Sequence, residues 1–291
     1  MSIEGEDIRW KSADGLDLYA RSYGPSDARL TVLCMHGLTR NHKDFEPMIA
    51  ALPGHFRFIA VDVRGRGLSA RDADAKNYSP FTYAADMAAL LDYLNIYRVA
   101  LIGTSMGGLM SMIMMKTMPQ RIRGVVLNDV GPVFEASGLK RIAAYTSDTE
   151  PKANWDEAAA AVGKIQADTF PDFGPDNWMA LARRTFRELE DGRVALDYDP
   201  AITRTISKVR PGLLTRIAMW RLFRKMTGAP LLVVRGERSD ILSEKTAAEM
   251  IKRHPDAERV TVPRVGHAPI LDEPEAIRVI GQFLSKVEPR A

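Results

Sequence analysis

The sequence predicts an α/β fold: a mostly parallel, eight-stranded sheet flanked by helices, with a helical cap inserted into it. The runs LTVLCMHG, RFIAVDVRG and RVALIG are continuously apolar, as in strands buried on both faces of a parallel sheet. Helical patterns alternate with these runs, which favours strands joined by crossover helices. From Gly131 to Gly228 only helical patterns occur. We therefore expect a core, residues 1–131 and 229–291, and a helical cap (lid), residues 132–228.

The remaining elements of the core follow the same alternation. DIRWKSADGLDLYARSYG predicts a β-hairpin, because Asp14 and Gly15 supply a tight turn between two partly alternating runs. SPFTYAADMAALLDYL predicts a helix, with Ser79 as a good N-cap and Pro80 suited to the first helical position. Beyond the cap, APLLVVRGE and ERVTVP predict strands, and the helices SEKTAAEMIKRH and EPEAIRVIGQFL complete the chain.

The composition is that of an ordinary globular protein, with 46% hydrophobic and 26% charged residues among 291. A formal net charge of +3 is too small to indicate nucleic acid as a partner. The single cysteine, Cys34, excludes an intramolecular disulfide and fits a reducing compartment. Neither a secretion signal nor a run of 18 apolar residues is present, so a cytoplasmic location without a membrane span is expected.

A serine lies between glycines where the strand RVALIG ends. Ser105 stands in GTSMGG, and an apolar helix is expected to follow it. The pattern G-x-S-x-G is typical of a nucleophile elbow, a tight strand–turn–helix that exposes the serine hydroxyl. Gly103 and Gly107 fit this elbow, because larger side chains would collide with the turn. The helix begins near Met106, and its first N–H groups favour negative charge beside Ser105, the candidate nucleophile.

A serine nucleophile needs a neighbouring base. Among the five histidines, His267 lies just beyond the last predicted strand. Loops at the carboxyl ends of strands converge at one edge of such a sheet, so His267 is the candidate base. Neither the histidines nor the cysteine have metal-ligand spacing, so no metal site is expected.

The third member of a catalytic triad is an acid that fixes the tautomer of the imidazole. Asp240 follows the strand in LLVVRGERSD by a short loop and is the leading candidate. Asp129, at the end of the strand VVLND, is the alternative, either as the acid or as a structural carboxylate. We favour Asp240, because the order Ser105, Asp240, His267 is the one expected for an elbow on this type of sheet.

The segments HGLTRN, DVRGRGLS, GTSMGG and GHAPILDEP together resemble motifs of the α/β-hydrolase fold family. The resemblance covers nearly the whole chain and is to the esterase- and lipase-like branch that has a serine nucleophile and a helical cap. It implies that the backbone N–H groups of Leu38 and Met106 form an oxyanion hole. It also implies that His36 shapes this loop, and that Asp62 and Arg64 hold the neighbouring loop in place.

By this resemblance the protein is expected to cleave carboxylic esters of short to medium acyl chain through an acyl-enzyme. The expected partner is a small-molecule ester, and neither a cofactor nor a metal is needed. Three alternatives remain open: a lactonase, a C–C bond hydrolase of vinylogous diketo acids, and a non-catalytic ligand receptor on the same fold. A homo-oligomer is compatible with the sequence.

A cluster of basic residues bears on the C–C hydrolase alternative, because such enzymes resemble one another in a cap that binds a carboxylate. Residues 204–225 hold no acidic residue, and we favour a solvated helix face that pairs with the acidic stretch at 188–199. The basic residues are Arg204, Lys208, Arg210, Arg216, Arg221, Arg224 and Lys225.

One stretch has the form of a dinucleotide-binding motif. GRGLSA, residues 65–70, fits G-x-G-x-x-A and follows a strand. That motif requires an apolar helix at this point, and RDADAKNYSP is a polar loop instead. We therefore expect no nucleotide cofactor.

Overall fold

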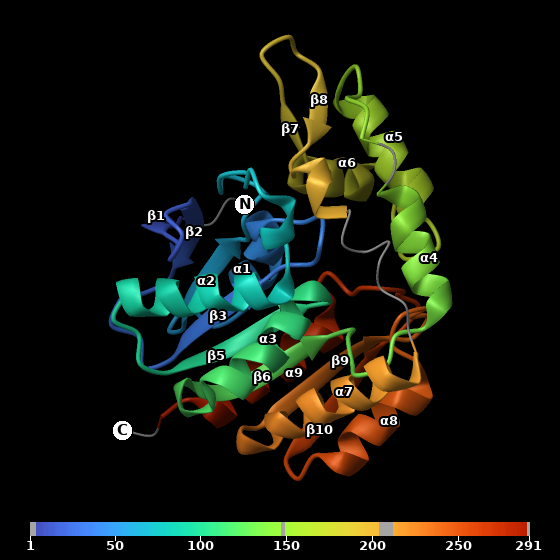
Figure 1. The fold of residues 1–291 in the computed structure, drawn as a ribbon. Coiled ribbons are helices and arrows are strands. Elements are labelled where there is room, and N and C mark those ends of the chain that lie inside the picture. The colour runs from blue at the N-terminus through green and yellow to red at the C-terminus, as the bar shows by residue number, and fades with distance from the viewer. Residues whose placement is uncertain (1–3, 147–148, 204–211, 290–291) are drawn as a thin grey trace.

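The computed structural model describes residues 4–146, 149–203 and 212–289, and their main feature is one eight-stranded sheet (Figure 1). Its strands are β1 (Glu6–Lys11), β2 (Asp17–Tyr23), β3 (Thr31–Met35), β4 (Arg57–Asp62), β5 (Val99–Thr104), β6 (Ile122–Asn128), β9 (Leu231–Gly236) and β10 (Ala257–Val262). They lie in the order β1-β2-β4-β3-β5-β6-β9-β10. The β1–β2 and β2–β4 pairs are antiparallel, and the other neighbours are parallel. The predicted fold class is confirmed.

Helices cover both faces of this sheet, which is why its central strands are continuously apolar. β3, β9 and nearly all of β5 are buried. One face packs against α2 (Pro80–Tyr93), α3 (Met106–Thr117), α7 (Leu213–Phe223) and α8 (Glu244–Arg253). The other face packs against α1 (Glu46–Ala51) and α9 (Pro274–Val287). α7 therefore joins the layers of the sheet although it falls inside the residue range predicted for the cap.

Side-chain caps begin two of these helices, and Ser79 is the cap that the sequence predicted. Ser79 Oγ accepts a hydrogen bond from the Thr82 N–H at the start of α2, where Pro80 is the first helical residue. Ser243 Oγ accepts one from the Thr246 N–H at the start of α8. Each bond satisfies a backbone donor that has no partner within its helix.

The segment between β6 and β9 stands largely outside the sheet layers, over the carboxyl ends of the strands (Figure 1). We refer to residues 132–228 as the insertion. It contains α4 (Ala136–Tyr145), α5 (Trp155–Gln166) and α6 (Pro175–Thr185) in addition to α7. A separate apolar cluster holds α5 and α6 together, and its buried members are Ala158, Ala159, Val162, Phe170, Leu181, Ala182, Phe186 and Val194.

The insertion also contains a β-hairpin, which corrects the expectation that it is purely helical. β7 (Phe186–Glu188) pairs antiparallel with β8 (Val194–Leu196). Between them Gly192 has a φ of 81°, a left-handed conformation that glycine adopts without steric cost. The helical pattern of PDNWMALARRTFREL runs on into Phe186, but α6 ends at Thr185 because the chain turns into this strand.

Charged residues fix two loops of the core, and one of these loops also contacts the insertion. The Asp62 carboxylate accepts hydrogen bonds from the His42 and Leu68 N–H groups, at 2.7 and 2.8 Å. Arg64 is buried and forms ion pairs with three carboxylates, at 2.6–2.9 Å. The Asp199 N–H then donates to the Gly65 carbonyl at 2.7 Å. Asp62 and Arg64 thus take the structural positions that the resemblance implied.

Candidate active site

Ser105 occupies a sharp turn between β5 and α3. Its φ is 50° and its ψ is −106°, a conformation rarely adopted by residues other than glycine. A Cβ on Gly103 would lie 2.4 Å from the Gly107 carbonyl, and one on Gly107 would lie 2.0 Å from the Met35 carbonyl. Both distances are below van der Waals contact, so only glycine fits. The geometry is that of the elbow that the sequence predicted.

His267 reaches this serine from the loop that follows β10. Its Nε2 lies 3.0 Å from Ser105 Oγ, and its Nδ1 lies 2.7 Å from Asp129 Oδ2. A carboxylate only accepts hydrogen bonds, so Nδ1 carries the proton and the lone pair of Nε2 faces the serine. Asn128 holds this loop, because its Nδ2 donates to the Pro269 carbonyl at 2.8 Å.

The carboxylate beside His267 is that of Asp129, which corrects the expectation for Asp240. Asp129 is buried at the end of β6, and it also accepts from the Gly236 N–H at 2.9 Å and from Ser239 Oγ at 2.6 Å. These two donors come from β9 and the loop after it. They aim the carboxylate of Asp129 at the imidazole.

Asp240 is engaged by a different side chain. Arg141 of α4 donates to both its carboxylate oxygens, at 2.7 and 2.8 Å. Partial burial acts to raise the pKa of Asp240, but the hydrogen bonds and charge of Arg141 lower it below its usual value. β6 and β9 are neighbours, so both aspartates lie at the same edge of the sheet. The sequence pattern could not show which one Arg141 takes.

The two candidate oxyanion donors flank the serine. Leu38 lies in the loop after β3, Met106 is the first residue of α3, and Leu38 lines the same pocket as Ser105. Among the described residues, neither backbone N–H has a hydrogen-bond acceptor. Both can therefore donate to a bound oxygen, which is what an oxyanion hole requires.

His36 shapes the Leu38 loop and does not face the pocket. Its Nε2 accepts from the Val63 N–H at 3.1 Å, and its Nδ1 donates to the Gly37 carbonyl at 2.6 Å. Burial lowers the pKa of His36 to about 4, so the ring is neutral at physiological pH. This matches the role that the resemblance implied for it.

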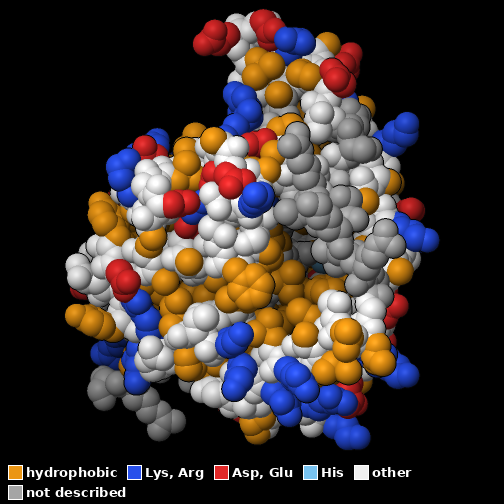
Figure 2. Space-filling view, viewed as in Figure 1, with side chains coloured by type: hydrophobic (Ala, Val, Ile, Leu, Met, Phe, Trp, Pro, Cys, Tyr) orange, Lys and Arg blue, Asp and Glu red, His pale blue; other side chains and the backbone are white. Residues whose placement is uncertain are grey.

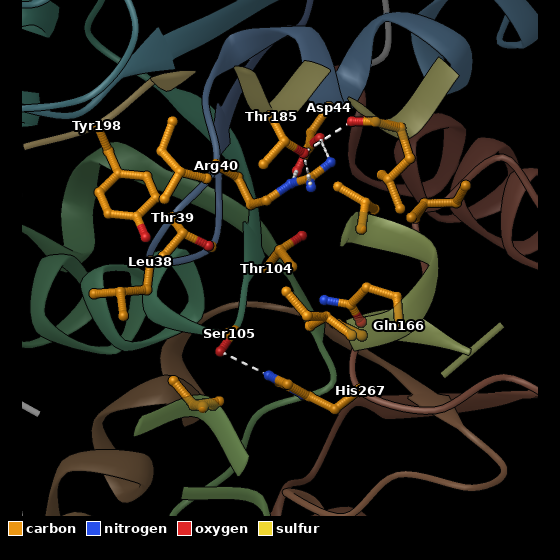
Figure 3. Close-up of a pocket in the computed structure, with 18 of the residues that line it drawn as sticks. Leu38, Thr39, Arg40, Asp44, Thr104, Ser105, Gln166, Thr185, Tyr198 and His267 are labelled. Carbon is orange, nitrogen blue, oxygen red and sulfur yellow. Dashed lines mark hydrogen bonds and ion pairs between the residues drawn. The ribbon is translucent and has the colours of Figure 1, made fainter. Parts of the chain in front are cut away.

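A pocket of about 140 Å³ opens beside Ser105 and His267. Its wall is mostly apolar, and one end is polar (Figure 3). The apolar residues include Ile142, Val162, Ile165, Phe170, Leu181, Phe186, Leu196 and Ile270. The polar end carries Arg40, Asp44 and Thr185. Arg40 lies in HGLTRN, but this sequence pattern does not show where its side chain points and so predicts no role for it.

The exposed basic residues of the insertion lie elsewhere. Arg216, Arg221, Arg224 and Lys225 are on α7 and just after it, where Figure 2 shows Lys and Arg gathered, and they do not line the pocket. The acidic stretch at 188–199 lies around β7 and β8, at the opposite end of the molecule (Figure 1). The expected pairing of the basic residues on and just after α7 with the acidic stretch at 188–199 is therefore wrong. Arg204, Lys208 and Arg210 lie outside the described residues.

The structure also bears on the absence of metal, membrane and nucleotide sites. In the part of the chain described, no three His, Cys, Asp or Glu side chains are grouped so as to hold a metal ion. No helix there has both the length and the apolarity needed to cross a bilayer. Residues 65–70 form turns and a bridge rather than the start of a helix, so the dinucleotide-binding geometry does not form at GRGLSA.

Comparison with known proteins places this chain in a family. The model of the "Alpha/beta hydrolase family" matches residues 32–278. A 3-hydroxybutyrate-oligomer hydrolase of Cupriavidus necator is 37% identical over 90% of each chain. A 2-(acetamidomethylene)succinate hydrolase of Mesorhizobium japonicum is 30% identical over 81% of each. The crystal structure of an α/β hydrolase from Novosphingobium aromaticivorans superposes with a TM-score of 0.91, at 42% identity, covering 98% of this chain and 100% of that one. The chain belongs to the α/β hydrolase family.

Proposed function

We propose that the protein is a serine hydrolase that cleaves carboxylic esters of short to medium acyl chain. The observation that carries this proposal is the line of contacts from Asp129 through His267 to Ser105, at 2.7 and 3.0 Å. The similar 3-hydroxybutyrate-oligomer hydrolase adds support, since oligomers of a hydroxy acid are joined by ester bonds. A small-molecule ester as substrate and the cytoplasm as location are part of the proposal.

In the first half of the reaction, His267 Nε2 takes the proton of Ser105 as Oγ attacks the ester carbonyl. Negative charge then develops on the carbonyl oxygen, which the N–H groups of Leu38 and Met106 receive. Such a donor typically contributes about 3–4 kcal/mol to transition-state stabilisation. Asp129 stabilises the imidazolium that forms. The tetrahedral intermediate collapses as His267 returns the proton to the departing alcohol, leaving an acyl group on Ser105.

In the second half, a water molecule takes the place of the alcohol. His267 removes a proton from the water as its oxygen attacks the acyl-enzyme, and the same two N–H groups again receive the negative charge. Ser105 leaves with the proton from His267, and the carboxylic acid is released. The protein ends in its starting protonation state, and each step uses side chains already in contact.

The test is a substrate panel of activated aryl esters, lactones and vinylogous diketo acids with intact protein and two variants. We expect ester turnover to fall by about 10³-fold or more in Ser105→Ala and in His267→Ala. Mass spectrometry of intact protein quenched during turnover should show an acyl adduct that Ser105→Ala lacks. A loss of tenfold or less in either variant would contradict the proposed roles. Turnover of diketo acids alone would favour the C–C hydrolase instead.

A further inference from the structure

The polar end of the pocket lies across the cavity from Ser105 and His267 (Figure 3). There the Arg40 side chain reaches into the cavity, and its Nε donates to Asp44 Oδ2 at 2.7 Å while Nη2 contacts the other carboxylate oxygen. Arg40 Nη1 donates to Thr185 Oγ1 at 2.6 Å, so a residue of α6 helps to orient the guanidinium. The guanidinium is therefore held in a fixed position inside the pocket.

Asp44 also interacts with a second arginine, Arg184, which does not line this pocket. The guanidinium of Arg184 lies close enough to act on the same carboxylate, and together with Arg40 it keeps the pKa of Asp44 below its usual value in spite of burial. Nε and Nη1 of Arg184 are buried and have no hydrogen-bond partner among the described residues. Two arginines thus share one ionised carboxylate.

An excess of buried positive charge is costly unless an anion compensates it. Arg184 lines a second cavity, which it shares with Asp272. Asp272 and Glu46 act on its charge, but among the described residues neither is recorded in an ion pair with it. Everywhere else the wall is mostly apolar, which suits a short aliphatic chain. A ligand that fits both features carries an anionic group at the end of a short chain.

We propose that Arg40 binds a carboxylate at the far end of the substrate, so that the preferred substrate is an anionic ester. The ester carbonyl lies at Ser105, and a short aliphatic chain leads from it to the carboxylate. A guanidinium is suited to this, because its planar N–H groups match the oxygens of a carboxylate. This assignment rests on the proposed ester hydrolysis, and it makes Arg40 the residue that determines specificity.

The test compares esters that differ only in charge. One pair carries the group on the acid half, monomethyl glutarate against the corresponding glutaramate. The other carries it on the alcohol half, the butyryl ester of 3-hydroxypropanoate against that of 3-hydroxypropanamide. The amide has nearly the same shape as the carboxylate but no charge. We expect kcat/KM to favour the carboxylate by about tenfold or more in at least one pair. A ratio below about threefold in both pairs would overturn the proposal.

The variant that tests the residue is Arg40→Gln with Asp44→Asn, which replaces the ion pair by a neutral pair and leaves the net charge unchanged. We expect this variant to lower the carboxylate-to-amide ratio of kcat/KM below about threefold. The matched control is Arg193→Gln with Asp191→Asn, an exposed ion pair of the same kind beside β8, which should keep the wild-type ratio. A folded Arg40→Gln/Asp44→Asn protein with an undiminished ratio would refute the assignment.

Two further measurements separate the outcomes. If the double variant does not fold, Arg40→Lys decides, because it keeps a cation but loses the planar guanidinium. The carboxylate-to-amide ratio of kcat/KM should then fall severalfold. An unchanged ratio would count against Arg40. Hydrolysis of a neutral aryl ester, compared with Ser105→Ala, is measured in parallel. Ser105-dependent hydrolysis without a preference for carboxylates overturns only the carboxylate site. No Ser105-dependent hydrolysis of any ester overturns the proposed function as well.

Discussion

Asp129 and Asp240 show how two identical side chains at one edge of a sheet acquire different partners. Asp129 is buried and accepts from Gly236 and Ser239, and its Oδ2 lies 2.7 Å from His267 Nδ1. Asp240 is partly exposed and is held by Arg141. The sequence predicted the serine and histidine because each carries a distinctive local pattern. It could not decide between the aspartates, because that choice depends on Arg141, almost 100 residues away from Asp240.

Exchanging the two carboxylates for amides tests this difference. In Asp129→Asn the side-chain oxygen can keep the Gly236 N–H, so the NH₂ faces His267 Nδ1 and forces the proton onto Nε2. That nitrogen can then no longer accept the serine proton, and kcat should fall by about 10⁴-fold. Asp240→Asn leaves the tautomer of His267 unchanged, and we expect a loss below about tenfold. Steady-state kinetics on one aryl ester decides; a larger loss at Asp240 would reverse the assignment.

At the scale of elements, most strands and helices followed from local patterns, and the β7–β8 hairpin did not. Continuous apolar runs predicted the parallel strands because helices bury both of their faces. Phe186 continues the apolar spacing of α6, so its local sequence favours a longer helix. The strand forms because residues 194–196 pair with it after a turn at Gly192, and the Asp-Gly pair at 191–192 was the available signal.

The elbow depends on the close approach of α3 to β3, which Gly107→Ala tests. The added methyl group would meet the Met35 carbonyl, so the helix must move away from the strand. We expect a loss of about 1–3 kcal/mol in the free energy of unfolding, measured by urea denaturation, together with a large loss of esterase activity. Gly54→Ala is the control, because nothing lies within 4 Å of its Cβ position. Equal stability of the two variants would contradict this account.

At the scale of the whole molecule, one buried carboxyl group links stability to pH. Glu273 precedes α9 in the loop after His267, and its Oε1 accepts from the Ile270 N–H at 3.0 Å. Its Oε2 is buried without a partner among the described residues. Burial raises the pKa of Glu273 to about 7 from 4.5. The folded protein therefore holds more protons than the unfolded chain between these values, so this group's contribution to stability decreases as pH rises through that window.

Glu273→Gln removes this dependence while keeping an acceptor for the Ile270 N–H. As the pH rises from 4.5 to 8, the free energy of unfolding of the variant should increase relative to that of wild type by on the order of 2 kcal/mol. Thermal unfolding at pH 5 and pH 8 measures the change. Glu275→Gln, in the first turn of the same helix, is the control and should show no such gain. A Tm difference for Glu273→Gln that is equal at both pH values would refute the pH linkage.

The loop that carries Leu38 is also fastened to the insertion. Asn41 directly follows Arg40, and its Nδ2 donates to the Arg184 carbonyl at 2.9 Å and to Asp197 Oδ2 at 3.1 Å. A movement of α6 away from the core must break these bonds, so the side of the pocket that α6 forms is held to the Leu38 loop. The candidate oxyanion donor at Leu38 and the side of the pocket formed by α6 therefore keep a constant spacing.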